Sequence, residues 1–134
     1  MMISTRGRYA LRVMVDLAEQ GGSGYTSMKS VAERQGVSLK YMEKIMPLLV
    51  SAGLVEGVQG KGGGYRLTRA PGSYRTGEIL RLTEGSLAPV SCLECGAEPC
   101  GRTADCRTRP FWTGLDRVIN EYLDSVTLES LMRK

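Results

Sequence analysis

A short turn between two helix-forming segments restricts the fold of this chain more than any other feature of its sequence. Thr26 or Ser27 can cap a first helix, and Gly36 can end that helix in the left-handed conformation of a helix C-cap. Ser38 can cap another helix directly afterwards. A helix, a Gly-Val-Ser turn and a second helix have the spacing of a helix-turn-helix. In that motif the first helix supports the second, so that its N-terminal side chains reach base edges.

Helical periodicity also covers the segments on either side of this turn. Residues 5–20 carry apolar side chains at intervals of three and four, which predicts an amphipathic helix ended by Gly21. Pro47 removes a hydrogen bond and is expected to kink the helix that Ser38 caps. We expect the apolar residues of that helix to be buried: Leu39, Met42, Ile45, Met46 and Leu49. The polar residues of its N-terminal part are expected to be presented outward: Lys40, Tyr41, Glu43 and Lys44.

A glycine-rich hairpin is expected next. Residues 54–59 and 64–67 have the pattern of two strands, joined by a tip at residues 60–63. Glycine permits positive φ and close approach to another backbone, while Gln59, Lys61 and Arg66 offer donors and charge for phosphate or minor-groove contact. A nucleotide-binding loop is disfavoured, because the GK[ST] signature is absent and the loop leads into a strand. The hairpin therefore predicts the wing of a winged helix-turn-helix domain.

Two more helices complete the expected architecture. Thr76 can cap a fourth helix that Gly85 ends, and Pro110 can open a fifth. The fifth helix carries a long apolar and aromatic stripe: Phe111, Leu115, Val118, Ile119, Tyr122 and Val126, with Trp112 and Leu123 at its edges. We favour dimerisation through this stripe over packing on the N-terminal part, because helix-turn-helix proteins read two half-sites as dimers.

The expected fold is therefore mainly α with a small β-hairpin wing. We divide the chain into a winged helix-turn-helix DNA-binding domain at residues 1–85, a cysteine-rich loop at residues 86–109, and a dimerisation helix with a tail at residues 110–134.

The net positive charge is concentrated in the N-terminal part. Residues 1–85 carry 12 Lys and Arg against 7 Asp and Glu, a net charge of +5, whereas residues 86–134 carry 6 against 7, a net charge of −1. A basic excess suits double-stranded DNA, because neutralised phosphates release counterions, although a solvated basic surface is the alternative. Arg12 and Asp16 interrupt the apolar N-terminal stretch, so it predicts neither a signal peptide nor a membrane span. We expect a cytoplasmic protein.

Four cysteines, Cys92, Cys95, Cys100 and Cys106, lie within fifteen residues of a chain that has no histidine. A chain of 134 residues can bury a core without disulfides, so these thiols favour metal binding or redox sensing. The interpretations are an iron–sulfur cluster, structural zinc, a cluster-free thiol switch and an exchange enzyme. Only Cys92 and Cys95 have zinc-knuckle spacing, and nearby arginines would favour thiolates. The βαβ unit of a thioredoxin-like enzyme is missing, and we expect no enzyme.

The order of these elements resembles the IscR-type winged-helix transcriptional regulators, a family of iron–sulfur regulators whose relatives include NsrR and CymR. The most specific marks are ISTRGRYAL at residues 3–11, YMEKI at 41–45, AGLV at 52–55 and GKGGGY at 60–65. Residues 114–116 and 122–128 also look like the dimer helix and tail of that family. The resemblance covers nearly the whole chain. It implies a homodimeric, bacterial, sequence-specific DNA-binding regulator, which we expect to be a repressor.

The resemblance also assigns expected roles to individual residues. A glutamate in the family's recognition helix accepts a hydrogen bond from cytosine, and residues at the base and tip of the wing enter the minor groove. The matching positions are Glu43, Gln59 and Lys61. A carboxylate only accepts hydrogen bonds, so the cytosine amino group suits it, and an exposed helix charge is the alternative for Glu43. We include nine further residues in the expected DNA-contacting set: Thr5, Arg8, Ser38, Lys40, Tyr41, Lys44, Gly60, Gly62 and Gly63.

Family members with a cluster use three cysteines in this loop, which match Cys92, Cys100 and Cys106. IscR completes the ligation with a histidine, but residues 107–109 here are Arg, Thr and Arg. Cys95 is the simplest fourth ligand of a [2Fe-2S] or [4Fe-4S] cluster, and a carboxylate of the loop or of the partner subunit is the second choice. We expect the cluster to control operator binding. Zinc, a thiol switch and a winged-helix module that binds a protein partner are the alternatives.

Overall fold

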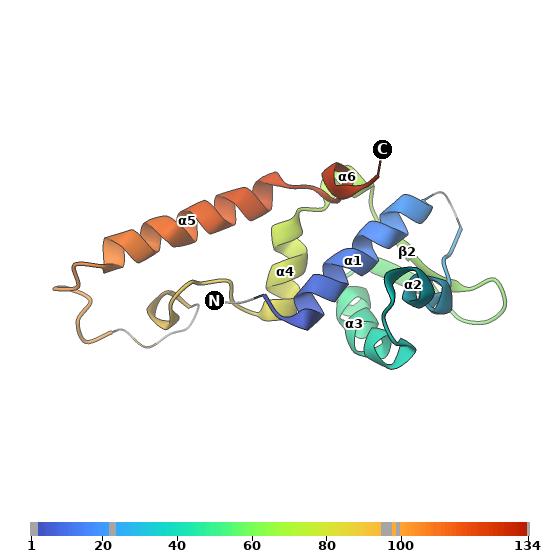
Figure 1. Ribbon diagram of the computed structural model, residues 1–134, viewed down its shortest axis with the longest axis horizontal. Coiled ribbons are helices and arrows are strands. Elements are labelled where there is room, and N and C mark those ends of the chain that lie inside the picture. Colours follow the sequence, from blue (N-terminus) through green and yellow to red (C-terminus); the bar gives the residue numbers. More distant parts are fainter. Residues whose placement is uncertain (1–2, 22–23, 95–97, 99, 134) are drawn as a thin grey trace.

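The computed structural model describes residues 3–21, 24–94, 98 and 100–133, which form a mainly helical fold with one antiparallel hairpin (Figure 1). The α-helices are α1 (Thr5–Gln20), α2 (Met28–Gln35), α3 (Leu39–Ser51), α4 (Thr76–Glu84), α5 (Arg109–Ser125) and α6 (Leu128–Leu131). The strands are β1 (Val55–Val58) and β2 (Gly64–Leu67), and the 3-10 turns are η1 (Pro71–Ser73) and η2 (Ser91–Leu93). The fold class predicted from the sequence is confirmed.

The hydrophobic core lies between α1, α3, α4 and the hairpin. The buried faces of the first two helices follow the predicted periodicity: Ala10, Val13, Met14 and Leu17 from α1, and Met42, Ile45, Met46 and Leu49 from α3. The predicted burial of Leu39 is wrong, since 46% of its surface is exposed. It shares the face of Met42 and Met46 but lies in the first turn of α3, at the edge of the core. The helix continues through Pro47 to Ser51.

Side-chain and glycine caps fix the helix-turn-helix. Ser27 caps α2 by accepting a hydrogen bond from the Ser30 amide at 3.1 Å. Gly36 ends that helix with φ 64° and ψ 34°, the left-handed conformation that glycine adopts without steric cost. Ser38 then caps α3 by accepting from the Tyr41 amide at 3.1 Å. The start and end of α2 and the start of α3 therefore lie where the sequence predicted.

The expected cap of α4 at Thr76 is wrong by one residue. Arg75 occupies the N-cap position and makes no side-chain cap hydrogen bond. Thr76 is the first residue of the helix, and its hydroxyl donates to the carbonyl oxygen of Leu123 at 2.7 Å. That hydroxyl therefore ties the start of α4 to the end of α5. Gly85 ends α4 with φ 78°, as predicted.

The hairpin is attached to the entry of α2. Its register pairs Val55 with Leu67 and Val58 with Gly64. Tyr65 of β2 forms an antiparallel bridge with Thr26, with two backbone hydrogen bonds of 2.8 Å. This bridge connects the hairpin to the residue just before the cap of α2.

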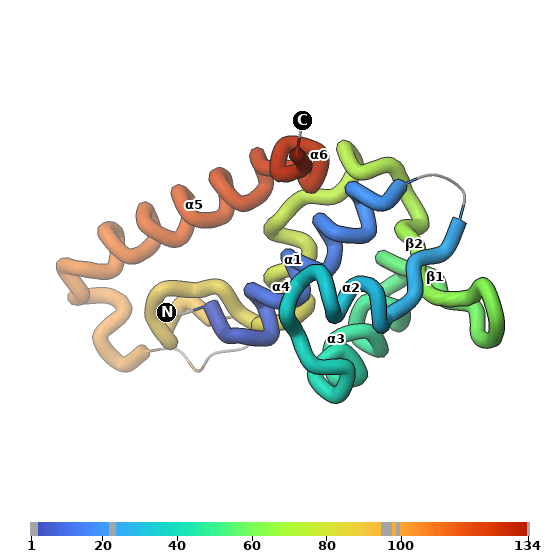
Figure 2. The backbone as a smooth tube through the Cα atoms, turned by 45° about the vertical axis from the view of Figure 1, so that its right-hand side comes forward, coloured from blue at the N-terminus to red at the C-terminus, as the bar shows by residue number. Residues whose placement is uncertain are grey.

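The long helix α5 projects away from the rest of the fold, and its first turn lies at the opposite end of the molecule from the hairpin tip (Figure 1). Its C-terminal half contacts α4 through Arg81, which donates to Asn120 at 2.7 Å and to Asp124 at 2.8 Å. The chain then returns to the core, where Leu128 of α6 is fully buried. Figure 2 shows the same arrangement from a second direction.

Candidate nucleic-acid interface

The N-terminal half of α3 presents polar side chains to solvent. Lys40, Glu43 and Lys44 are exposed, and within the described part of the chain they make no hydrogen bond or ion pair. Tyr41 is half-buried, with its ring packed edge-on against Tyr9 at a centroid distance of 5.3 Å. Three of the four predicted side chains are thus free to contact a partner, whereas Tyr41 also supports the packing of α3 on α1.

A buried carboxylate fixes the orientation of α2 behind α3. Asp16 of α1, 2% exposed, accepts hydrogen bonds from Arg34 at 2.8 and 3.0 Å and from Gln35 at 2.9 Å. Arg12 donates in turn to the side-chain oxygen and the backbone carbonyl of Gln35. The bidentate pair joins the last turn of α2 to α1, which sets the direction in which the following turn and α3 leave.

The tip of the wing, the hairpin of residues 55–67, requires glycine at particular positions. Gly60 and Gly62 have φ of 97° and 80°, and the Gly63 amide donates to the Gly60 carbonyl at 3.0 Å. A Cβ atom on Gly63 would lie 2.1 Å from the carbonyl oxygen of Val58, so the turn excludes a side chain there. Gln59 and Lys61 are exposed on either side of Gly60. The wing therefore holds a polar tip on a tightly constrained turn.

The third group of expected contacts lies in the first turn of α1. Thr5 and Arg8 are exposed, and the Arg8 guanidinium donates to the Thr5 hydroxyl at 3.1 Å. In both views α3 and the wing lie on the side of the molecule away from α6 (Figures 1 and 2). The structure thus leaves the predicted contact residues of α1, α3 and the wing largely exposed, and their contacts with DNA stay a prediction.

The cysteine segment, residues 86–109, contains little regular structure among its described residues. Cys92 lies in η2, Cys100 is exposed and Cys106 precedes α5, and all three thiols are free. Cys95 lies outside the described residues. Within the described part of the chain, no three cysteine, aspartate or glutamate side chains are grouped to hold a metal ion. The donors are chemically suited to an iron–sulfur cluster, because thiolates are its usual ligands, but the described conformation does not gather them.

Cys106 has a distinct environment among the described cysteines. Its sulfur lies 3.4 Å from the hydroxyl of Thr108. Hydrogen bonding from that hydroxyl lowers the pKa of Cys106, with smaller contributions from backbone amides and the Arg109 charge. Cys106 therefore loses its proton more readily than an ordinary cysteine.

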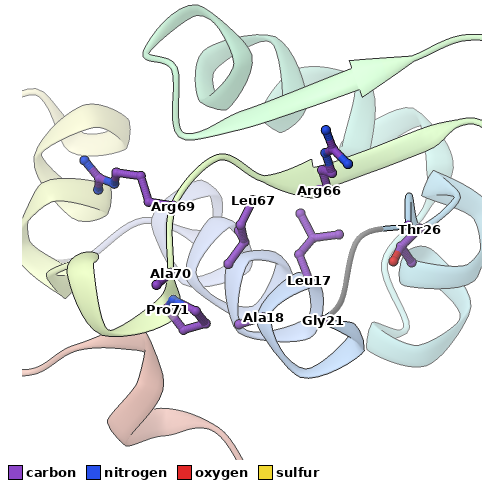
Figure 3. A pocket seen from close by; sticks show the side chains of 10 residues that line it. Leu17, Ala18, Gly21, Thr26, Arg66, Leu67, Arg69, Ala70 and Pro71 are labelled. Carbon is purple, nitrogen blue, oxygen red and sulfur yellow. The ribbon is translucent and has the colours of Figure 1, made fainter.

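A hollow of about 210 Å³ lies between the end of α1 and β2 (Figure 3). Leu17 and Leu67 point toward it, whereas Arg66 and Arg69 point away (Figure 3). Arg66 pairs with Glu56 at 2.5 Å and Arg69 with Glu78 at 2.6 Å. The described lining contains no carboxylate or thiol that could serve acid–base or nucleophilic chemistry. No described helix is both long and apolar enough to cross a membrane.

Comparison with known proteins decides the family. A sequence model of Rrf2, described as an iron-dependent transcriptional regulator, matches residues 3–134. The chain belongs to the Rrf2 family. It is 40% identical over 131 residues to the HTH-type transcriptional regulator CymR of Bacillus subtilis, covering 98% of this chain and 89% of that protein. It is 36% identical over 132 residues to the HTH-type transcriptional regulator IscR of Aliivibrio salmonicida, covering 98% and 77%.

Solved structures of the Rrf2 family share this fold. The structure of CymR, described as the global cysteine regulator of B. subtilis, matches with a TM-score of 0.79 at 40% identity, covering 98% of this chain and 95% of that one. The structure of IscR from T. potens matches with a TM-score of 0.76 at 37% identity, covering 98% and 85%. The relatives are transcriptional regulators, so this Rrf2 chain is a regulator and not an enzyme.

Three residues that hold elements of the candidate interface in place were not singled out from the sequence as functional. In the sequence, Asp16 indicates only a charge that interrupts an apolar stretch. Glu84, the last residue of α4, accepts hydrogen bonds from the amide and the hydroxyl of Ser4. Tyr74 is fully buried, and its hydroxyl donates to the Leu54 carbonyl at 2.7 Å while accepting from the Thr68 and Arg69 amides. A polar residue on the apolar face of a helix was the available signal for Asp16. Glu84 gives no local signal because its partner Ser4 is 80 residues away, and the Tyr74 hydroxyl donates to a carbonyl 20 residues away.

Proposed function

We propose that this Rrf2-family regulator is a homodimer that represses transcription by binding operator DNA through α3 and the wing, under the control of the cysteine segment. The observation that carries the proposal is the set of unpaired polar side chains on the N-terminal half of α3. Glu43 is flanked by Lys40 and Lys44, and all three are exposed without a partner in the described chain. A base-edge acceptor between two cations suits a major groove lined by phosphates.

Dimerisation is supported by the exposed members of the predicted apolar stripe, which are Phe111, Leu115, Val118 and Tyr122 of α5; Val126, predicted in the same helix, lies just beyond its end. These side chains are 63%, 36%, 56% and 67% exposed. Asn120 and Asp124, which contact α4, lie on the opposite face of the helix at 100° per residue. A stripe of this kind on a helix that projects from the core suits a second copy of the same helix, as the isologous contact of a symmetric dimer requires.

We propose an iron–sulfur cluster as the group held by the cysteine segment, with Cys92, Cys100 and Cys106 as ligands and Cys95 as the candidate fourth. Bound there, the cluster would supply a redox- and oxygen-sensitive centre whose presence depends on iron supply. The segment joins the end of α4 to the start of α5, so gathering its thiols would restrain both ends. The two recognition helices of a dimer must enter successive major grooves about 34 Å apart, so a small change in their relative placement weakens both contacts.

A cluster-free thiol switch is the second candidate, because the described residues do not gather the thiols around one point. The similarity to CymR, described as a cysteine regulator, also supports it. In this case oxidation of the segment, instead of cluster loss, would alter DNA binding.

Anaerobic purification separates these candidates. A cluster gives brown protein with absorbance above about 300 nm, stoichiometric iron and acid-labile sulfide, all reduced in the Cys106→Ser variant. Colourless, metal-free protein whose DNA binding changes on oxidation supports the thiol switch, and colourless protein loaded with zinc contradicts both. Mobility shift on promoter DNA tests whether the protein binds DNA at all. Capture of a protein partner without any shift of promoter DNA would be the contrary result.

A further inference from the structure

Glu84, the last residue of α4, makes contact with the beginning of α1. Its Oε1 accepts hydrogen bonds from the Ser4 amide at 2.9 Å and from the Ser4 hydroxyl at 2.7 Å. Ser4 is the N-cap of α1, and its hydroxyl oxygen accepts from the Gly7 amide at 3.1 Å. One carboxylate thus holds the residue that starts α1, across a sequence separation of 80 residues.

The position of this charge suits α1 better than α4. An acidic side chain at the end of a helix faces the negative end of its own dipole, which is unfavourable. The first turn of α1 contains no acidic residue of its own. The Glu84 carboxylate therefore supplies negative charge to the positive end of α1, where the dipole favours it. Its placement is explained by the start of α1 and not by the stability of α4.

Gly7 makes room for this contact. It is buried in the first turn of α1, and a Cβ atom there would lie 2.2 Å from Glu84 Oε1. Glycine is unfavourable inside a helix relative to alanine, so its use here needs a reason. The close approach of the carboxylate provides that reason, and Gly7 and Glu84 form a matched pair.

The same junction touches the start of the cysteine segment. After Gly85, Leu87 is buried, and a hollow of about 220 Å³ is lined by Ile3 together with residues 86–91 and Glu94. Cys92 follows in η2. Figure 2 shows this segment running beside the beginning of α1. Glu84 therefore lies between the cysteine segment and the turn that presents Thr5 and Arg8.

We propose that Glu84 is a positioning residue for operator binding: it fixes the first turn of α1 so that Thr5 and Arg8 reach the DNA backbone. This inference rests on the proposed function, since it assigns a role within the same DNA interface. Glu84 itself touches no DNA. Its effect passes through Ser4, and its place at the root of the cysteine segment links that segment to the α1 contacts.

The test compares variants of the full chain on one duplex, selected from a random pool by the wild-type protein. Equilibrium affinity is measured over a range of KCl concentrations. For Glu84→Ala we expect about tenfold weaker binding and a salt slope smaller by about one per lost phosphate contact. Glu84→Gln should have the salt slope of the wild-type protein, because the glutamine amide oxygen can accept the same two hydrogen bonds. Glu78→Ala, on the same helix and paired with Arg69, is the matched control and should leave the slope unchanged.

Gly7→Ala provides an independent check, because the added Cβ displaces the Glu84 carboxylate although residue 84 itself is not mutated. It should reproduce the Glu84→Ala slope, and the double variant should bind no worse than Glu84→Ala. A purely structural role would lower the thermal midpoint of Glu84→Ala without changing its salt slope, and that result overturns the proposal while sparing the proposed function. If the wild-type chain selects no duplex, both are overturned.

Discussion

Glu43 and Lys61 are exposed side chains with opposite expected roles on DNA. A carboxylate at a base edge discriminates between bases, whereas a lysine at the wing tip contacts phosphate irrespective of sequence. Glu43→Ala should therefore lower discrimination between selected and mismatched duplexes by about 1–3 kcal/mol. Lys61→Ala should weaken binding to all duplexes and reduce the salt slope by about one. Competition binding across duplexes at several salt concentrations measures both; equal losses on every duplex for the two variants would contradict the assignment.

Asp16 and Arg34 form an ion pair in which only the carboxylate is buried, so removing one partner does not cost the same unfolding free energy as removing the other. Asp16 is 2% exposed, whereas the Arg34 side chain is 38% exposed. Arg34→Ala leaves a buried carboxylate with Gln35 as its remaining described donor, which we expect to cost about 2–3 kcal/mol of unfolding free energy. Adding Asp16→Asn removes the stranded charge and should recover part of that loss. Urea unfolding of the four combinations measures the coupling, and strictly additive effects would show that the pair is not coupled.

Individual residues differ in how far the sequence revealed them. Glu43 and Lys61 were predicted from matched motifs, because those motifs are local. Asp16 and Glu84 were not predicted as partners of Arg34 and Ser4, since both pairs form only after distant helices pack. Tyr74 likewise has a hydroxyl satisfied by backbone groups up to 20 residues away. A sequence shows that these polar residues exist, but their partners depend on tertiary structure.

At the scale of elements, the contact between α4 and α5 includes an ion pair between Arg81 and Asp124. Asp124 accepts hydrogen bonds from Arg81 at 2.8 and 3.0 Å. Hydrogen bonding to that guanidinium, and then its charge, lowers the pKa of Asp124 below its ordinary value near 3.8. The carboxylate therefore stabilises the folded chain above its ordinary pKa, and the contribution is lost as pH falls through the lowered value.

Asp124→Asn should test this joint through its pH dependence. The side chain is 48% exposed, so solvent screening limits the effect at pH 7 to about 0.5 kcal/mol of unfolding free energy. The difference from wild type should shrink as pH falls through the lowered pKa of Asp124, because the protonated carboxyl and the amide are then both uncharged. Glu121→Gln, whose partner Arg117 is 3.9 Å away and largely exposed, is the control and should show little difference at either pH. An unchanged difference in acid would exclude the ionised pair as its source.

Elements were predicted well where the signal is local and less well where it depends on packing. The caps at Ser27, Ser38 and the glycine at 36 set the helix-turn-helix from sequence alone. The Thr76 hydroxyl was wrongly expected to cap α4 because its true acceptor, the Leu123 carbonyl, is 47 residues away. The burial of Leu128 was not anticipated either, since its helix α6 spans only residues 128–131 and gives no periodic pattern.

At the scale of the whole molecule, α5 is attached at one end. Its C-terminal half is held by Arg81 and Thr76, and no residue of the helix is buried in this chain. Its first turn continues from the cysteine segment at the end farthest from the wing (Figure 1). A dimer formed through the stripe would therefore have the cysteine segments next to its contact and the wings away from it.

Val118→Glu should separate dimerisation from folding. Val118 is 56% exposed in the single chain, so a glutamate there remains solvated in the monomer and the thermal midpoint should change little. In a dimer it would bury two like charges against each other, which we expect to cost several kcal/mol of association energy. Light scattering should show a monomer, and affinity for a two-half-site duplex should fall toward that for one half-site. Arg117→Gln, which lies about 100° around the helix from Val118 and away from the stripe, should stay dimeric. A dimeric Val118→Glu protein with unchanged DNA affinity would place the interface elsewhere on the molecule.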